Sequence, residues 1–351
     1  MIIAKAAYLF FVTIAAAASA EHGIDYIPSS SHVTVADSLR IFYRTWAPRV
    51  GDPKAIVYIC HGIAEHSERY SRFAVDIVRG LGVKVVAPDH RAHGLTSNLM
   101  DRGFLHRGEV SAREDPISLM AFDLLEVIKN SNSGNALPVF LFGHSVGSVI
   151  ARVALVKADS AIRGSIKGVI LSGVPTAPSL VEYNLLAGLG PLIKWSGVGL
   201  EYIQKTLIYG KFDDLVRSRV GNPKLGGNCF ISSNPEAVTA YNEHPLSGHL
   251  VDPEILVSIG TNLMKIHFDP TAFYAPLEDT KVDMLYISGR DDPVCMFGAT
   301  AQTDAQNTQR LGHLSHEVYI AGARHEFLNE VESIREFGVS QVMAWIKSRI
   351  F

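Results

Sequence analysis

The sequence has little cysteine, no concentration of positive charge and no glycosylation acceptor. Three cysteines among 351 residues are too few for a disulfide-stapled small domain, and a chain of this length buries a sizeable core without them. Acidic residues number 35 and basic residues 32, interspersed to a formal net charge of -3. The absence of a basic stripe excludes nucleic acid as an expected partner. Because no Asn-x-Ser/Thr triplet occurs, N-glycosylation is not expected.

Metal-binding and cofactor-binding motifs are also missing. Four histidines lie in two short segments, but no pair has the spacing or the cysteine partner of a metal site: His61, His66, His90 and His93. We therefore predict no metal and no cofactor. We expect these imidazoles to hydrogen-bond the backbone of their own loops.

The apolar run at the N-terminus is too short for a relaxed membrane span. Lys5 is followed by apolar or small residues over 6–18, whereas a span needs roughly 20. Ala18-Ser19-Ala20 fits a signal-peptide cleavage site. We expect residues 1–20 to be a signal peptide, and the protein to be secreted or to lie in the endomembrane lumen. The alternative is an uncleaved N-terminal segment that anchors the chain in a membrane.

An odd number of cysteines leaves one thiol free in a secreted chain. Cys60 ends an apolar run and is expected in the core. A bridge between Cys229 and Cys295 is possible, and the sequence leaves it open.

Strand and helix patterns alternate along most of the chain. The continuous apolar run at 55–60 is typical of a strand buried on both faces, and the apolar-rich stretches 83–89, 137–142, 166–172 and 282–288 also predict strands. Residues 32–36 and 40–46 suggest two antiparallel strands, and 317–320 a final strand. Helical periodicity marks 70–80, 117–129, 148–155, 298–309 and 329–348. This alternation predicts a mostly parallel α/β sheet flanked by helices, with its core in 21–174 and 276–351.

The alternation stops between residues 175 and 275. This segment has no strong buried strand, and its leucine-rich part is interrupted by Gly188, Gly190 and Pro191. We interpret 175–275 as a helical cap or lid whose apolar face meets a lipid chain. Ordinary helical core is the alternative.

The pentapeptide Gly143-His144-Ser145-Val146-Gly147 stands between an apolar strand and a helix. In that context G-x-S-x-G is typical of a nucleophile elbow, in which a tight turn raises the serine above the sheet edge. The following helix favours negative charge at its N-terminus. Ser145 is therefore the candidate nucleophile, and a glycine-rich structural turn is the alternative.

A nucleophilic serine needs a histidine base and a carboxylate. His325 follows the strand that ends at Ile320, and Asp291 and Asp292 follow the strand that ends at Ser288. The order Ser145, Asp292, His325 is the one expected for this chemistry on an alternating sheet. Asp292 is preferred over Asp291 because Pro293 fixes the turn after it.

An oxyanion hole needs two backbone N–H donors near the serine. One is expected from Val146, directly after the nucleophile, and the other from the loop 61–66. Gly62 permits a backbone turn there, so that Ile63 is the second expected donor.

These segments resemble the monoglyceride lipase and lysophospholipase branch of the α/β-hydrolases, also described as serine aminopeptidase S33-like. The resemblance covers about residues 31–351. It rests on six stretches, which are 61–70, 88–94, 137–147, 241–246, 289–292 and 324–330.

The resemblance implies an α/β-hydrolase fold with a mostly parallel central sheet flanked by helices and an inserted helical cap. It implies Ser145, Asp292 and His325 as the triad, and Ile63 and Val146 as oxyanion donors. It further implies monoacylglycerol or lysophospholipid substrates, and a cap that docks transiently on membranes.

By the same resemblance, Arg69 and Tyr241 match positions near the polar head group. The structural alternative is Arg69 paired with a carboxylate such as Glu65, and Tyr241 packed in the cap. The chain departs from the family pattern at Ser148, Ala92, His244 and Leu328. The last two departures bear on the head group, and the sequence around His325 leans toward the lysophospholipases.

The sequence thus predicts a serine hydrolase that cleaves carboxylic esters of single-chain lipids. Two alternatives use the same scaffold and triad on another substrate: a short-chain carboxylesterase, or an exopeptidase that cleaves an amide. A third is a non-catalytic lipid-binding protein.

Overall fold

The computed structural model describes residues 26–97, 103–104, 115–196 and 199–351. The predicted signal peptide lies outside these residues. Within the described ranges, no helix is both long and apolar enough to cross a bilayer.

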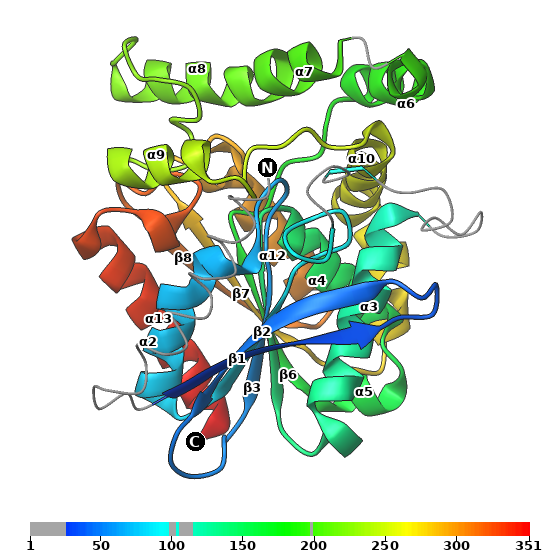
Figure 1. Ribbon diagram of the computed structural model, residues 1–351, viewed down its shortest axis with the longest axis vertical. Coiled ribbons are helices and arrows are strands. Elements are labelled where there is room, and N and C mark those ends of the chain that lie inside the picture. The colour runs from blue at the N-terminus through cyan, green and yellow to red at the C-terminus, as the bar shows by residue number, and fades with distance from the viewer. Residues whose placement is uncertain (1–25, 98–102, 105–114, 197–198) are drawn as a thin grey trace, which may run out of the picture.

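An eight-stranded sheet in the order β1-β2-β4-β3-β5-β6-β7-β8 forms the centre of the described chain (Figure 1). β1 (Tyr26–Thr34) pairs antiparallel with β2 (Arg40–Pro48), and β2 pairs antiparallel with β4 (Lys84–Pro88). The remaining neighbours are parallel: β4, β3 (Ile56–Cys60), β5 (Val139–His144), β6 (Ile166–Ser172), β7 (Asp283–Gly289) and β8 (Leu314–Ile320). The predicted mostly parallel sheet flanked by helices is confirmed.

Alternate side chains of the central strands pack against different helices, as the period of a strand requires. Tyr58 lies in the cluster that holds α3 (Pro116–Ser131), α4 (Val146–Lys157) and α12 (Ala299–Arg310). Ile59 lies in the cluster that holds α2 (Ser71–Leu81) and α13 (Glu332–Ile350). Burial on both faces explains why these strands read as continuous apolar runs.

Helices fill most of the segment between β6 and β7. They are α6 (Leu180–Ser196), α7 (Leu200–Tyr202), a π-helical segment (Ile203–Tyr209), α8 (Gly210–Val220), α9 (Pro235–Glu243), α10 (Pro253–Phe268) and α11 (Pro270–Tyr274). Of these, α6, α7, α8 and α9 lie at the end of the molecule away from the C-terminus (Figure 1). Figure 1 shows α6, α7 and α8 as an outer layer above α9 and α10.

The remaining described helices are short. They are α5 (Ser160–Ser165) and the 3-10 turns Ser67–Tyr70, Ser133–Asn135, Ala275–Leu277, Met296–Gly298 and Phe327–Asn329. The last of these turns explains why α13 begins at Glu332 and not at the expected residue 329.

All three cysteines are free and buried. Cys60 lies in the core as predicted. The possible bridge between Cys229 and Cys295 is not formed, because each thiol has its own surroundings. The Cys229 thiol faces the carbonyl of Asp213 at 3.8 Å, and the Cys295 thiol that of Asp292 at 3.6 Å.

Candidate active site

Ser145 occupies a strained turn between β5 and α4. Its φ of 53° and ψ of -124° lie in a region that residues with a side chain seldom adopt. The turn is held because Ser145 N donates to the Ser172 carbonyl at 2.8 Å. In addition, the Ser145 carbonyl accepts from Ser148 N at 2.9 Å and Ser148 Oγ at 2.6 Å. Ser148, a departure from the family pattern, thus supports the elbow.

The two glycines of the pentapeptide are required by close backbone approach. A Cβ on Gly147 would lie 2.0 Å from the Cys60 carbonyl oxygen, and one on Gly143 would lie 2.4 Å from the Gly147 carbonyl oxygen. Neither space can admit a side chain.

His325 and Asp292 are joined by a hydrogen bond of 3.0 Å between Nδ1 and Oδ2. β7 and β8 are parallel neighbours, so the loops after them meet at one edge of the sheet. Asp292 is fully buried, and its other oxygen accepts from Val294 N at 2.9 Å. Asp291 instead faces Arg219 at 3.3 Å, so the structure brings Asp292, and not its neighbour, to the histidine.

The two groups shift each other's proton affinity. Burial raises the pKa of Asp292, but His325 and the surrounding donors outweigh burial and lower it overall. Burial lowers the pKa of His325, but the charge and hydrogen bond of Asp292 outweigh burial and raise it overall. The pair therefore favours an ionised aspartate and a histidine that readily holds a proton.

The imidazole of His325 lies beside the elbow. Its ring centroid is 4.7 Å from that of His144, the residue before Ser145. A Cβ on Gly173 would lie 3.0 Å from the His325 ring. The residue before Gly173 is Ser172, whose carbonyl accepts the hydrogen bond from Ser145 N. The candidate base His325, the candidate acid Asp292 and Ser145 thus lie together at the carboxyl ends of three parallel strands.

The loop after β3 reaches the same point. A Cβ on Gly62 would lie 3.3 Å from Ser145 Cβ, so Ile63, the next residue, follows a backbone segment that passes close to Ser145. Gly62 N donates to Glu65 Oε1 at 2.5 Å and fixes the loop. Val146 is the first residue of α4, where an N–H has no partner within its own helix.

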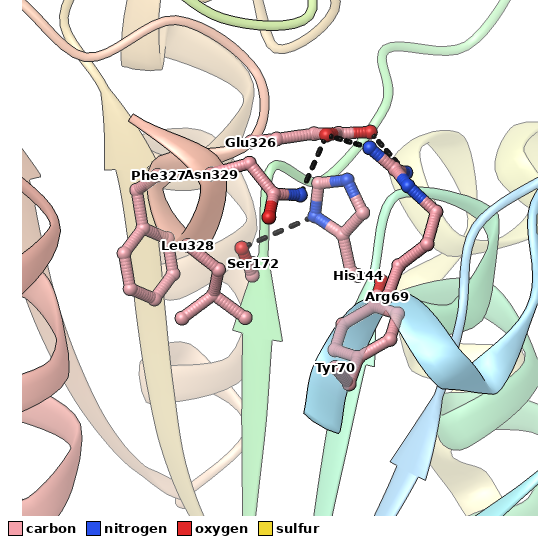
Figure 2. A pocket seen from close by; sticks show the side chains of 8 residues that line it. All are labelled: Arg69, Tyr70, His144, Ser172, Glu326, Phe327, Leu328 and Asn329. Atoms are coloured by element: carbon pink, nitrogen blue, oxygen red, sulfur yellow. Dashed lines mark hydrogen bonds and ion pairs between the residues drawn. The ribbon is translucent and has the colours of Figure 1, made fainter. Parts of the chain in front are cut away.

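Arg69 is paired with Glu326, which follows His325. Its guanidinium donates to the two Glu326 oxygens at 2.8 and 2.6 Å (Figure 2). A cavity of about 10 Å³ beside this pair has room for about one water molecule. Its lining includes His144, whose pKa burial lowers to about 3, so that its ring is neutral.

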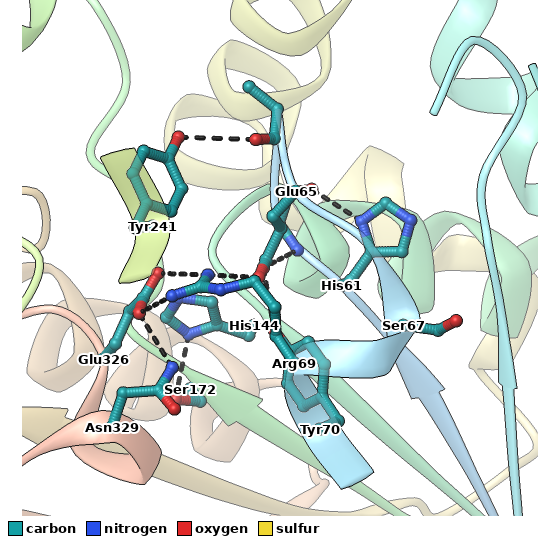
Figure 3. Close-up of polar contacts among 12 residues, drawn as sticks. His61, Glu65, Ser67, Arg69, Tyr70, His144, Ser172, Tyr241, Glu326 and Asn329 are labelled. Carbon is teal, nitrogen blue, oxygen red and sulfur yellow. Dashed lines mark hydrogen bonds and ion pairs between the residues drawn. The ribbon is translucent and has the colours of Figure 1, made fainter. Parts of the chain in front are cut away.

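Glu65 completes a cluster of three charges with Arg69 and Glu326, in which both carboxylates are buried and the Arg69 side chain is 12% exposed (Figure 3). Glu65 accepts from Arg69 at 2.6 Å and from the Tyr70 hydroxyl at 2.8 Å. Burial and the charge of Glu326 raise the pKa of Glu65, although the donors around it favour the carboxylate. Burial raises the pKa of Glu326, but the charge and hydrogen bonds of Arg69 outweigh burial and lower that pKa to about 2.

Both residues expected near the head group make internal contacts. Arg69 is held by two carboxylates, which is the structural alternative stated for it, with Glu326 as a second partner. Tyr241 is buried, with its ring 4.9 Å from the Arg69 guanidinium and its hydroxyl 3.4 Å from the Ala64 carbonyl oxygen. Tyr241 also lines a larger cavity of about 190 Å³, together with Gln204, Lys205, Tyr209, Asp213, Gly227, Asn228, Gly248, His249 and Leu250.

The clustered histidines mostly bind loop backbone, as predicted. His61 Nδ1 lies 2.7 Å from the Gly62 carbonyl oxygen, and its Nε2 accepts from His90 N at 3.0 Å. His93 Nδ1 lies 2.9 Å from the Arg91 carbonyl oxygen. His66 instead stacks on His244, with ring centroids 4.3 Å apart. Among the described residues, no group of three or more His, Cys, Asp or Glu is arranged to hold a metal.

Sequence reasoning missed the role of the charged residues on either side of His325. Arg324, Glu326 and Glu330 are all buried, which is unusual for charged side chains. The signal was available, because three charges within seven residues flank a candidate base. The sequence does not show the partners of these side chains, which include Cys229 for Arg324, Arg69 for Glu326 and Ser233 for Glu330.

Comparisons with known proteins point to one family. The family model described as serine aminopeptidase, S33 matches residues 51–332. The monoglyceride lipase of Rattus norvegicus is 25% identical over 323 residues, covering 91% of this chain and 90% of that protein. A monoglyceride lipase homolog of monkeypox virus is 30% identical over 317 residues, covering 90% of this chain and 96% of the homolog.

A solved structure shares the fold. The carboxyl esterase of Bacillus coagulans, solved in complex with glycerol, superimposes with a TM-score of 0.73 at 23% sequence identity. The match covers 92% of this chain and 99% of the esterase.

Proposed function

Since the chain belongs to the serine aminopeptidase S33 family, in the monoglyceride-lipase-like branch of the α/β-hydrolases, we propose that it cleaves esters of single-chain lipids through Ser145, His325 and Asp292. That it is a carboxylic ester hydrolase follows from the family and its relatives. The observation that carries the triad is the 3.0 Å bond between His325 and Asp292 beside the strained turn at Ser145.

The proposed reaction has two halves. Ser145 Oγ attacks the ester carbonyl carbon while His325 Nε2 takes the hydroxyl proton, and the carbonyl oxygen becomes an oxyanion. The backbone N–H groups of Ile63 and Val146 donate to that oxyanion. When the tetrahedral intermediate collapses, the C–O bond to the alcohol breaks and His325 returns the proton to the departing oxygen.

Water then releases the acyl group from Ser145. His325 takes a proton from the water, the resulting hydroxide adds to the acyl carbon, and the serine oxygen leaves with the proton from His325. Asp292 holds the imidazole in one tautomer and stabilises its charged form throughout. The products are a fatty acid and the free alcohol.

The charges near the triad favour a neutral head group. The Arg69 guanidinium is already paired with two carboxylates, those of Glu65 and Glu326. This cation is therefore not free to bind the phosphate of a lysophospholipid, whereas glycerol needs no cation. We therefore favour monoacylglycerol as the substrate, with lysophospholipid as the second candidate.

The outer layer of the cap is suited to transient contact with a lipid surface. α6 exposes Leu180, Val181, Leu185 and Leu189, with exposed fractions of 64, 77, 57 and 42%. Exposed apolar patches of this kind mark interaction sites. We propose that α6 meets the surface from which substrate is drawn. A secreted or endomembrane location, based on the predicted signal peptide, is part of the same proposal.

A substrate panel with Ser145→Ala as the control tests the function. The panel holds a monoacylglycerol, lysophosphatidylcholine, an aryl acetate and an aminoacyl amide. We expect the monoacylglycerol to have the highest kcat/KM and Ser145→Ala to have none. Preference for the acetate or the amide would establish the short-chain esterase or the exopeptidase instead.

A further inference from the structure

Residues 229–233, between α8 and α9, hydrogen-bond directly to the loop that carries His325. His325 N donates to the Phe230 carbonyl at 3.1 Å, and Glu326 N donates to the Ile231 carbonyl at 2.8 Å. The Phe230 ring centroid lies 6.0 Å from that of His325. The backbone of the candidate base is therefore held by the cap, although the base follows a core strand.

Two buried charged side chains strengthen this junction. One guanidinium nitrogen of Arg324 donates to the carbonyls of Cys229 and Ser232, at 2.7 and 2.9 Å. The Glu330 carboxylate accepts from Arg324 N at 2.8 Å, from Ser233 N at 2.9 Å and from the Ser233 hydroxyl. Arg324 and Glu330 are only 8 and 3% exposed. Charge-assisted hydrogen bonds in such surroundings are strong and directional.

The junction continues into α8 through Asp213. Its Oδ1 accepts from Phe230 N at 3.1 Å, and its Oδ2 accepts from Asn228 N at 2.8 Å. Asp213 is itself 4% exposed. A continuous set of hydrogen bonds thus leads from α8 to His325, whereas Asp292 and Ser145 are held by loops of the core.

We propose that Arg324 and Glu330 are positioning residues that couple the cap to the catalytic base, so that the placement of 229–233 sets the geometry of His325 toward Asp292 and Ser145. This inference rests on the proposed function, because it takes His325 as the base. A displacement of α8 by substrate or by a lipid surface would then change the turnover rate as well as substrate binding.

Arg324→Lys and Glu330→Gln test the coupling, because each keeps the length of the side chain and weakens its contacts. The substrate is a water-soluble short-chain aryl ester, so that lipid binding by the cap does not limit the rate. Turnover is expressed per site that reacts with a fluorophosphonate probe, so that unfolded protein is not counted. KM and the pH dependence of kcat/KM are measured alongside.

The matched control is Arg163→Lys. Arg163 also donates to backbone carbonyls, those of Pro276, Val156 and Ala158, but it contacts none of the triad. The same substitution there reproduces the loss of an arginine–carbonyl contact without touching the His325 loop.

We expect kcat per reactive site to fall on the order of 10- to 100-fold in both test variants, with KM little changed, because small displacements of a base cost this much. The acid limb of the pH profile should also move, since the contact between His325 and Asp292 is altered. Wild-type kcat and an unmoved acid limb, as expected for Arg163→Lys, would overturn the coupling.

A milder variant keeps the test decisive if Arg324→Lys or Glu330→Gln fails to fold. Ser233→Ala removes only the hydroxyl contact to Glu330 from a half-buried position. A smaller fall in kcat in the same direction supports the coupling, and an unchanged kcat and acid limb contradict it. If the wild-type protein itself does not react with the probe, the proposed function fails, and not the coupling alone.

Discussion

Arg69 and Glu326 join two loops that are 257 residues apart in the sequence, through two hydrogen bonds of 2.8 and 2.6 Å. One loop carries the expected oxyanion donor Ile63, and the other carries His325. Because Glu65 holds Gly62 N as well as Arg69, the same cluster fixes the loop that would supply the oxyanion donor. The distance between two parts of the proposed machinery is thus set by buried charges.

Removing Arg69 should destabilise the protein strongly. Arg69→Ala leaves Glu65 and Glu326 buried without their shared cation, and we predict a loss of about 3–5 kcal/mol in the free energy of unfolding. Denaturant unfolding measures it. The matched control is Arg72→Ala, which breaks an exposed pair with Glu332 and should change stability little. Equal effects of the two variants would contradict a structural role for the buried cluster.

Asp292 and Asp291 offer a test within two adjacent positions. We predict that Asp292→Asn lowers kcat by about 10⁴-fold, because the imidazole loses the partner that fixes its tautomer. Asp291→Asn should have little effect, since that carboxylate faces Arg219. Steady-state kinetics on one aryl ester compares them. A large loss in Asp291→Asn with activity retained in Asp292→Asn would reverse the assignment of the acid.

Activity should be lost on acidification. In the proposed mechanism, only a neutral His325 imidazole can accept the proton of Ser145. Burial lowers the pKa of His325, but Asp292 outweighs burial and raises that pKa above its ordinary value of 6.5. The midpoint of the acid limb of kcat/KM should therefore lie above pH 6.5, and above it activity reaches its plateau. In the residual activity of Asp292→Asn this midpoint should fall. A wild-type midpoint well below pH 6.5 would contradict the raised pKa.

Gly62 should not tolerate a side chain. A Cβ there would lie 2.8 Å from Glu65 Oε1 and 3.3 Å from Ser145 Cβ, so Gly62→Ala must push the loop that carries Ile63 away from Ser145. We predict a loss on the order of 10²–10³ in kcat, comparable to removing one oxyanion donor. Gly164→Ala is the control, because a Cβ at that position meets nothing within 4 Å. Wild-type kcat in Gly62→Ala would argue against this loop as part of the oxyanion hole.

Much of the fold could be predicted because its signals are local. A strand in the middle of a sheet is rich in apolar residues, and the limits that the sequence predicts for the strand at 166–172 are those of β6. The tight turn at Ser145 could be predicted for the same reason, because it depends on the two glycines within the pentapeptide 143–147. The order of Ser145, Asp292 and His325 added a restraint, because parallel neighbouring strands bring their following loops together.

The contacts of the charged residues could not be predicted from the sequence. Arg324 binds the backbone carbonyls of Cys229 and Ser232. Every residue has such a carbonyl, so the sequence does not indicate which ones an arginine will bind. Arg69 had several carboxylates within reach along the sequence, and its pairing with Glu326 depends on how two loops meet in space. The arrangement of the cap helices could not be predicted from the sequence, because these helices pack partly on one another and partly on the core.

The most direct test of the central claim is to locate the covalent adduct that a fluorophosphonate forms with the protein, by mass spectrometry of its peptides. We predict a single adduct on Ser145, absent after Ser145→Ala and slowed strongly after His325→Ala. An adduct on another residue, or labelling that persists in Ser145→Ala, would contradict Ser145 as the nucleophile.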